Sequence, residues 1–361
     1  MPNERTQVKA TIRRAMLAAQ QATNELDAQA MRELKTLYEG VLVEIQHLIT
    51  QHADELGQVR LTQLNQLTRQ LEEVLNQLHL TQSSMVSGHV VLAAKQGGNV
   101  FATSVATESV AAAIDSATMA VKHMKQKDGL QLSDRLWRVN KKAKEAVIGA
   151  VERAVILGQS ASEAAQDFRN KALPIPSHIS QQAQMANSAS LNRTMASALM
   201  QDEGAPYYQI KRVMRTEINR AHGVAFQQAA FEDEFVAGTK FKLSPNHPRR
   251  DICDMHARVN LYGLGKGVYP KGKSPWPAHP NTISYEQVVF VDEITEDDKQ
   301  TDGSRLNWLK RQSQAQQHAV LGHQKKVSAL QKDLLTENMI ATPWKHLEPA
   351  LKRKGIDTST L

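Results

Sequence analysis

The sequence has little cysteine, few aromatic residues and no long apolar run. A single cysteine among 361 residues cannot form an intramolecular disulfide, so nothing in the sequence calls for an oxidising compartment. The longest apolar runs are short or interrupted by charge, which excludes a membrane-spanning helix. Aromatic residues make up only 5% of the chain, and Ala, Leu and Gln are abundant. This composition favours helices packed through aliphatic side chains over a β-sandwich.

Several familiar sequence signatures are also missing. The chain has no phosphate-binding P-loop, no GxSxG nucleophile elbow and no tandem repeat. The basic beginning, MPNERTQVKATIRRAMLAAQQA, lacks the apolar centre of a secretory signal, and its periodicity continues into the next segment. We therefore expect this beginning to be part of the mature protein.

Two N-terminal segments each carry apolar residues at spacings of three and four. These residues are Leu34, Leu37, Val41, Ile45 and Leu48 in the first segment and Leu64, Leu67, Leu71, Val74 and Leu78 in the second. Such spacing places each set on one stripe of a helix. The intervening HADELGQ offers a break, so the pattern predicts an antiparallel helix pair that packs within the chain. A coiled coil with a partner is the alternative.

The rest of the chain suggests a mainly α fold with a small α/β module. We expect an N-terminal helical region (1–127), a helical connector (128–176), an α/β module (177–295) and a basic helical C-terminal region (296–361). Helix breaks are predicted at KQGG and at Gly158. Alternating apolar residues predict strands near 237–244 and 285–294. The forty residues between these strands are rich in Gly and Pro, and we expect them to be irregular.

That excursion contains a cluster of residues that could bind a metal. Zinc prefers cysteine and histidine ligands in tetrahedral sets. The candidate residues for a metal site or a structural knuckle are His247, Asp251, Cys253, Asp254, His256 and His279. Thr282 and Ser284 stand where a second pair of ligands would be expected, and neutral hydroxyls are poor zinc ligands. The sequence therefore favours a knuckle held by hydrogen bonds without a cofactor, with zinc as the alternative.

Two catalytic interpretations use the same segment. In the first, Cys253 is a thiolate nucleophile with a histidine as its base and an aspartate that orients the histidine. The second is a metal-dependent nuclease or related hydrolase, in which basic surroundings hold phosphate and a metal activates water. That interpretation centres on a small set of residues, His247, Asp251, His256 and His279.

Charged residues near this segment suggest anchoring and anionic partners. The motif RTEINRAH places Arg215, Glu217 and Arg220 on one helix, either as surface ion pairs or as anchors for the excursion. Residues 235–285 contain eight basic residues and two acidic ones, and an acidic stretch, VDEITEDDKQTD, separates them from a basic C-terminal region. This arrangement predicts contact with DNA or an acidic partner. The expected contact residues are Lys240, Lys242, Arg249, Arg250, Lys266, Lys271 and Lys273.

Several of these blocks together resemble the head morphogenesis, or minor head protein, family of tailed phages, the Mu-like F proteins. The resemblance is carried by RTEINRAH, LSPNHPRRDICDMHA, GLGKGVYP, PWPAHPN and WLKRQSQAQQHAVLGHQKKV. The upstream segment SDRLWRVNKKAKEAVIGAVERAVILGQSASEAA resembles the family more weakly. It covers roughly residues 128–335. The family pattern typically continues as HP-x-C-x-C, where this sequence has Thr282 and Ser284.

The resemblance implies a virion structural protein that is not an enzyme. Such a protein is assembled in the host cytoplasm, is present in few copies inside the head, and acts in capsid assembly, DNA packaging and DNA ejection. Its expected partners are the portal protein, the major capsid or scaffold protein and double-stranded DNA. The departure at Thr282 and Ser284 implies a knuckle that has lost part of its ligand set.

Overall fold

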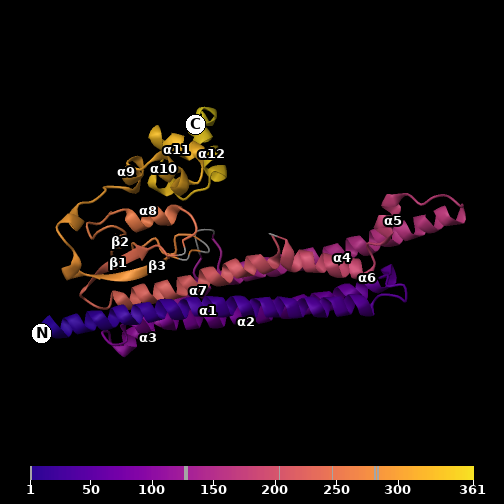
Figure 1. Ribbon diagram of the computed structural model, residues 1–361, viewed down its shortest axis with the longest axis horizontal. Helices are drawn as coiled ribbons and strands as arrows, with labels where there is room; N and C mark the ends of the chain where they lie inside the picture. The colour runs from indigo at the N-terminus through magenta and orange to yellow at the C-terminus, as the bar shows by residue number, and fades with distance from the viewer. Residues whose placement is uncertain (1, 126–128, 203, 246, 280–281, 283) are drawn as a thin grey trace. The chain divides into compact units, whose positions relative to one another are not determined.

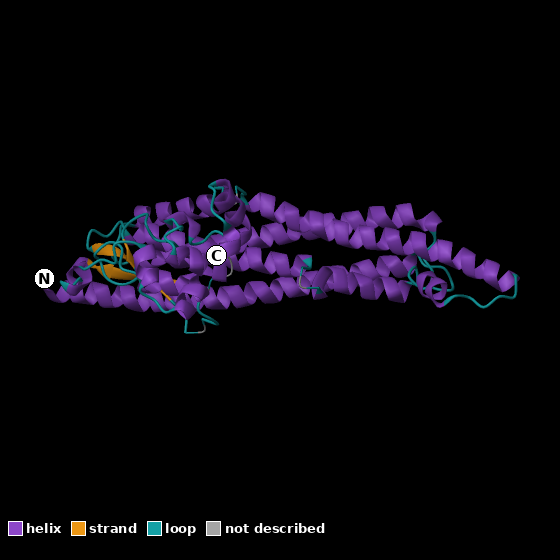
Figure 2. Cartoon of the chain, turned by 90° about the horizontal axis from the view of Figure 1, so that it is seen from above, coloured by secondary structure: helices purple, strands orange, loops and turns teal. Residues whose placement is uncertain are grey.

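The computed structural model describes residues 2–125, 129–202, 204–245, 247–279, 282 and 284–361. The fold is mainly helical with one small three-stranded antiparallel sheet, which confirms the predicted fold class (Figure 1). Figure 2 shows how strongly helix predominates over strand. No helix in the described part of the chain is long and apolar enough to cross a membrane.

The chain forms two compact units that are not consecutive in sequence. We call residues 1–23, 93–118 and 219–361 the sheet unit, and residues 24–92 and 119–218 the helical unit. Four long or medium helices contribute residues to both units: α1 (Pro2–Gln51), α2 (Leu61–Gly98), α3 (Thr107–His123) and α7 (Pro206–Ala230). The four consecutive regions expected from the sequence stay a prediction. The two compact units divide the chain differently, because four helices contribute residues to both units.

In the helical unit, α1 and α2 form the predicted antiparallel pair. The hydroxyl of Tyr38 donates to Gln82 Oε1 at 3.1 Å, and Glu33 Oε2 lies 3.3 Å from His89 Nε2. Residue numbers increase along α1 while the numbers of the partner residues in α2 decrease, so the two helices are antiparallel. The turn falls in the expected HADELGQ segment, between the end of α1 and the start of α2.

The third long helix of this unit corrects one prediction. Helix α4 spans Leu132–Asn170 and does not stop at Gly158. A β-carbon at Gly158 would lie 2.7 Å from the β-carbon of Ala186, so glycine here permits close packing and does not end the helix. Two shorter helices follow, α5 (Ser177–Ala183) and α6 (Ser188–Ala196), and a π-helical turn spans Ser197–Gln201.

The sheet unit contains three strands in the order β2–β1–β3. They are β1 (Val236–Lys242), β2 (Val268–Tyr269) and β3 (Tyr285–Phe290), and both pairings are antiparallel. Thr239 pairs with Tyr269 on one side and with Val288 on the other. The two long strands match the prediction. The excursion between them is not wholly irregular, however, because it contains β2 and the helix α8 (Ile252–Arg258).

Short helices complete the sheet unit. They are α9 (Arg305–Lys310), α10 (Gln314–Leu321), α11 (Gln324–Gln331) and α12 (Trp344–Arg353), and 3₁₀ turns span Asn99–Phe101, Val291–Glu293, Asp297–Lys299, Glu337–Met339 and Thr358–Thr360. These helices share one hydrophobic core with α8 and β1, in which Cys253, Met255 and Phe241 are buried. The cysteine-bearing helix is therefore held between the sheet and the C-terminal helices.

Candidate functional site

The two aspartates of DICD cap the helix that carries Cys253. Asp251 is the N-cap residue of α8, and its carboxylate accepts from the Cys253 amide at 2.7 Å. Asp254 reaches back and accepts from the Asp251 amide at 3.0 Å. This reciprocal capping box satisfies amide groups that the first turn of a helix leaves without partners. The spacing of the aspartates thus has a structural explanation that requires no metal.

Cys253 meets the end of the excursion inside the protein. Its side chain is fully buried, and its Sγ lies 3.1 Å from His279 Nε2 and 3.7 Å from Thr282 Oγ1. His279 Nε2 also lies 3.2 Å from Asp251 Oδ2. Two of the candidate residues from the sequence, Cys253 and His279, are thus in contact, and Thr282 lies beside the thiol.

A second group shares Asp251 and contains His247. Its Nε2 lies 3.2 Å from Asp254 Oδ2 and 3.6 Å from Asp251 Oδ1. Arg258 contacts the other oxygen of Asp254 at 3.2 Å. Burial alone would raise the pKa of Asp251, but hydrogen bonds from His279 and the Cys253 amide, with the charges of both histidines, hold that pKa below its usual value.

His256 does not join either group. Among the described residues, two sets place possible ligand atoms within 4.8 Å of one another: Asp251 with Cys253 and His279, and His247 with Asp251 and Asp254. The buried ring of His256 packs against Phe241, with 5.8 Å between the ring centroids. Its carbonyl accepts a hydrogen bond from the Tyr269 hydroxyl at 2.9 Å. Of the three, Cys253 and His279 therefore share one set, and His256 belongs to neither.

The donor atoms fit zinc in type but only partly in number and spacing. A thiolate, an imidazole and a carboxylate are ordinary zinc ligands, and a tetrahedral site would separate sulfur from nitrogen by about 3.5 Å. The 3.1 Å between Cys253 Sγ and His279 Nε2 is closer than that and matches a direct hydrogen bond to sulfur. Thr282 brings a hydroxyl where a thiolate would complete the set. The geometry favours a hydrogen-bonded knuckle, with a three-ligand zinc site as the alternative.

The excursion is anchored to α7 by residues that sequence reasoning missed. Asn219 Nδ2 donates to the Thr282 carbonyl at 3.0 Å, and the Trp276 indole donates to the Asn219 carbonyl at 3.4 Å. The indole fits because residue 223 is glycine, where a β-carbon would lie 1.9 Å from Trp276 Nε1. Asn219 follows Glu217 by two residues within RTEINRAH, so the motif contributes to anchoring the excursion through Asn219. The anchoring roles expected of Arg215, Glu217 and Arg220 stay predictions.

A buried carboxylate anchors the middle of the excursion to the sheet. Glu286 on β3 accepts from Ser274 at 2.6 Å, from Thr239 at 2.9 Å and from Gln227 at 2.5 Å. Burial raises the pKa of Glu286, and the three hydrogen bonds oppose that rise. The contact from Ser274 joins the proline-rich part of the excursion to the core of the sheet.

The residues expected to anchor the excursion have other described partners. Glu217 is buried and contacts Arg135 of α4 at 2.9 Å, whereas Arg215 contacts Asp27 of α1 at 3.0 Å. Arg220 has an interaction within the chain, as does Glu217 beyond its contact with Arg135. In the described contacts, Arg215 and Glu217 link long helices of the helical unit, and the anchoring of the excursion comes from Asn219.

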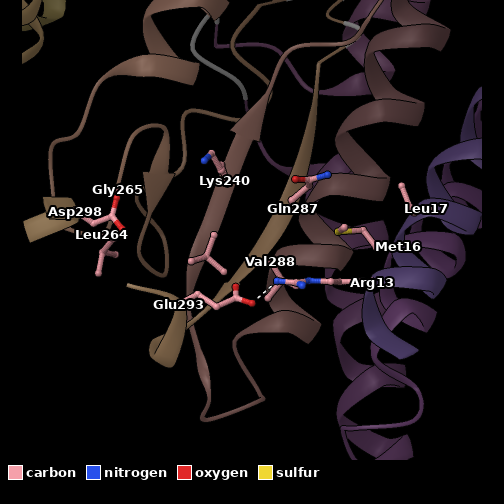
Figure 3. Close-up of a pocket in the computed structure, with 11 residues that line it drawn as sticks. Arg13, Met16, Leu17, Lys240, Leu264, Gly265, Gln287, Val288, Glu293 and Asp298 are labelled. Atoms are coloured by element: carbon pink, nitrogen blue, oxygen red, sulfur yellow. Dashed lines mark hydrogen bonds and ion pairs between the residues drawn. The ribbon is translucent and has the colours of Figure 1, made fainter. Parts of the chain in front are cut away.

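The expected DNA-contacting residues do not line one common cavity. Lys240 lines a pocket of about 390 Å³ over the sheet, between Met16 and Leu17 of α1 and the Leu264–Gly265 turn (Figure 3). Arg249 and Arg250 line a different cavity beside the C-terminal helices. Lys266, Lys271 and Lys273 are exposed, Lys242 is partly buried, and Lys271 lies 3.9 Å from Glu232.

Comparison with known proteins adds no identification. The chain matched no protein-family model, no curated protein and no solved structure. Function must therefore be argued from the residues and their geometry.

Proposed function

We propose that this chain is a structural protein of a phage head, of the minor head class, that binds the portal and the capsid interior during assembly. DNA contact is a secondary role. The proposal begins with the sequence blocks that resemble the Mu-like F proteins. It gains support from how those blocks are used in the fold.

The observation that carries the proposal is that the blocks fold on one another as structural parts. Asn219 of RTEINRAH holds Thr282, and Cys253 of DICD meets His279 of PWPAHPN. In GLGKGVYP, the Gly267 amide donates to the Val259 carbonyl at 2.9 Å and its carbonyl accepts from the Phe241 amide at 2.8 Å. Each block thus supplies contacts that fix the excursion, which suits a rigid assembly module.

A binding assay with the portal protein of the same genome tests this role. We expect the full chain to co-elute with the purified portal in size-exclusion chromatography. When the chain is omitted, the portal should elute alone. An unrelated portal protein of similar size serves as the control for nonspecific binding. Separate elution of the chain from its own portal, and from assembled capsid protein, would contradict the proposal.

A metal-dependent nuclease is the second candidate. The observation in its favour is that Asp251 belongs to two sets of possible metal ligands, one with Cys253 and His279 and one with His247 and Asp254, and within each set the ligand atoms lie within 4.8 Å of one another. Purified chain would be incubated with plasmid DNA and Mg²⁺, Mn²⁺ or Zn²⁺. Cleavage that disappears in His279→Ala, with unchanged circular dichroism, would establish the nuclease. We expect no cleavage that depends on both the metal and His279.

A further inference from the structure

A cavity of about 710 Å³ lies beside the knuckle in the sheet unit. Arg249, Arg250 and His279 line it on the side of the excursion. The opposite side comes from the ends of the C-terminal helices and includes His318, Ala341 and Thr342, together with His323, Lys326 and Trp344. We call it the arginine cavity. Its volume lies within the range of pockets that hold small ligands.

The fixed charges of the arginine cavity are mainly positive. Within the described residues, Arg249 and Arg250 make no hydrogen bond or ion pair through their side chains, and both are exposed. The one acidic residue of the lining, Asp251, is already engaged by His279 and by the Cys253 amide. Two consecutive arginines that line one cavity, with no carboxylate partner among the described residues, offer N–H donors to an anion.

A third cation is buried in the wall of the arginine cavity. Lys326 is 2% exposed, and its ammonium group donates to the carbonyls of Ile340 at 2.5 Å and Thr342 at 3.0 Å. An ammonium group has three donors, so one remains beyond these two contacts. Burial lowers the pKa of Lys326 to about 8, which still leaves most of the amine protonated at neutral pH. This fixed charge increases the positive potential of the cavity.

Two further features suit a phosphate. Helix α12 begins at Trp344 without a side-chain cap, and the first amides of a helix favour anions. A guanidinium group binds phosphate through two parallel N–H donors, which Arg249 and Arg250 can supply. The rings of His323 and Trp344 are stacked on each other, with 5.2 Å between centroids, and Trp344 is 9% exposed, so this pair forms a packed wall of the cavity.

We propose that the arginine cavity binds a phosphate group of nucleic acid, with Arg249 and Arg250 as the principal donors. The chemistry is that of a phosphate carried by a nucleotide, and its source is a free nucleotide or a DNA strand. The inference deepens the DNA contact of the proposed function, on which it rests only for the choice of DNA as the source. Phosphate binding by the purified chain can fail while portal binding succeeds, and the reverse, so the two proposals are tested separately.

The test is a fluorescence anisotropy titration of the full chain with labelled short single-stranded and duplex DNA. The double variant Arg249→Glu with Arg250→Glu is compared with Arg353→Glu with Lys354→Glu, which changes the charge equally on two exposed, consecutive residues of the same unit. We expect the Arg249 and Arg250 variant to lose about tenfold or more in affinity and to flatten the salt dependence, and the control variant to lose about twofold or less.

Competition experiments identify the source of the phosphate. A third variant provides a further test of the cavity. Displacement by inorganic phosphate or a mononucleotide assigns the site to a single phosphate, whereas displacement only by strands assigns it to DNA. Ala341→Glu places a carboxylate in the cavity at an exposed position and should weaken binding as well. Equal losses in both double variants, no binding of any phosphate ligand, or stronger binding of an oligoglutamate peptide than of DNA would each overturn the proposal.

Discussion

Cys253 Sγ lies 3.1 Å from His279 Nε2, although twenty-six residues separate them in the sequence. Thr282 Oγ1 lies 3.7 Å from the same sulfur and cannot act as a strong zinc ligand. Replacing Thr282 with cysteine would place a second thiolate beside the first. We predict that Thr282→Cys purifies with about one zinc per chain, whereas the wild type purifies with far less.

Metal analysis by mass spectrometry measures this difference directly. Thr282→Ser is the matched control, because it keeps the hydroxyl and should leave the zinc content at the wild-type level. If the wild type itself carries about one tightly held zinc per chain, the segment is a knuckle but the preference for a metal-free knuckle is wrong.

Gly97 allows α2 to approach α7 very closely. A β-carbon at this position would lie 2.1 Å from the His222 carbonyl oxygen, a backbone atom that cannot move alone. We predict that Gly97→Ala lowers the free energy of unfolding by roughly 1–3 kcal/mol because it overpacks this contact. Gly88 lies on the same helix, and a β-carbon there would have nothing within 4 Å, so Gly88→Ala should stabilise by about 0.5–1 kcal/mol.

Urea unfolding followed by circular dichroism measures both glycine variants. The opposite signs provide the test, because both variants add one methyl group to one helix. A stability loss in Gly97→Ala no larger than that in Gly88→Ala would show that α2 and α7 do not meet at this point.

His222 should make stability depend on pH in the acidic range. Burial lowers its pKa to about 4, and its Nδ1 lies 3.0 Å from Thr23 Oγ1. Because the folded pKa is below the ordinary value near 6.5, the unfolded state binds more protons between these values. Stability is therefore complete above about pH 6.5 and declines as the pH falls towards 4, by roughly 2–3 kcal/mol.

Thermal melts from pH 7 to pH 4 test this dependence. His222→Asn keeps a polar group near the position of Nδ1 and does not titrate, so its melting temperature should fall less over the same range. His47→Asn replaces an exposed histidine of α1 and should follow the wild type. Identical pH profiles for wild type and His222→Asn would remove His222 as the source of the acid sensitivity.

Periodicity alone is enough to predict the long helices and the two main strands. The stripes at spacings of three and four predict α1 and α2, because a buried helix face repeats every 3.6 residues. Alternation around Phe241 predicts β1, in which Thr239 and Phe241 are buried and Lys240 is partly exposed. These signals are local, so they can be read without knowledge of the partner element.

Glycine misleads the sequence interpretation where its role depends on a distant segment. The break predicted at KQGG is present, because α2 ends at Gly98. Gly158 looks like a helix break, but it lies within α4, where it permits close packing against Ala186. The residue types mark Cys253 and His279 as candidates for one site. They cannot indicate that His256 packs on Phe241 or that Asn219 anchors the excursion, because those contacts depend on where α7 and β1 lie.

The proposed role as a structural protein of a phage head is tested most directly on purified heads. Quantitative mass spectrometry would be applied to heads from a host that produces the portal, the major capsid protein and this chain. We expect this chain to be present in a few copies per head and to survive washing at high salt. Complete heads that contain the portal but lack this chain, although it is soluble in the same cells, would contradict the proposal.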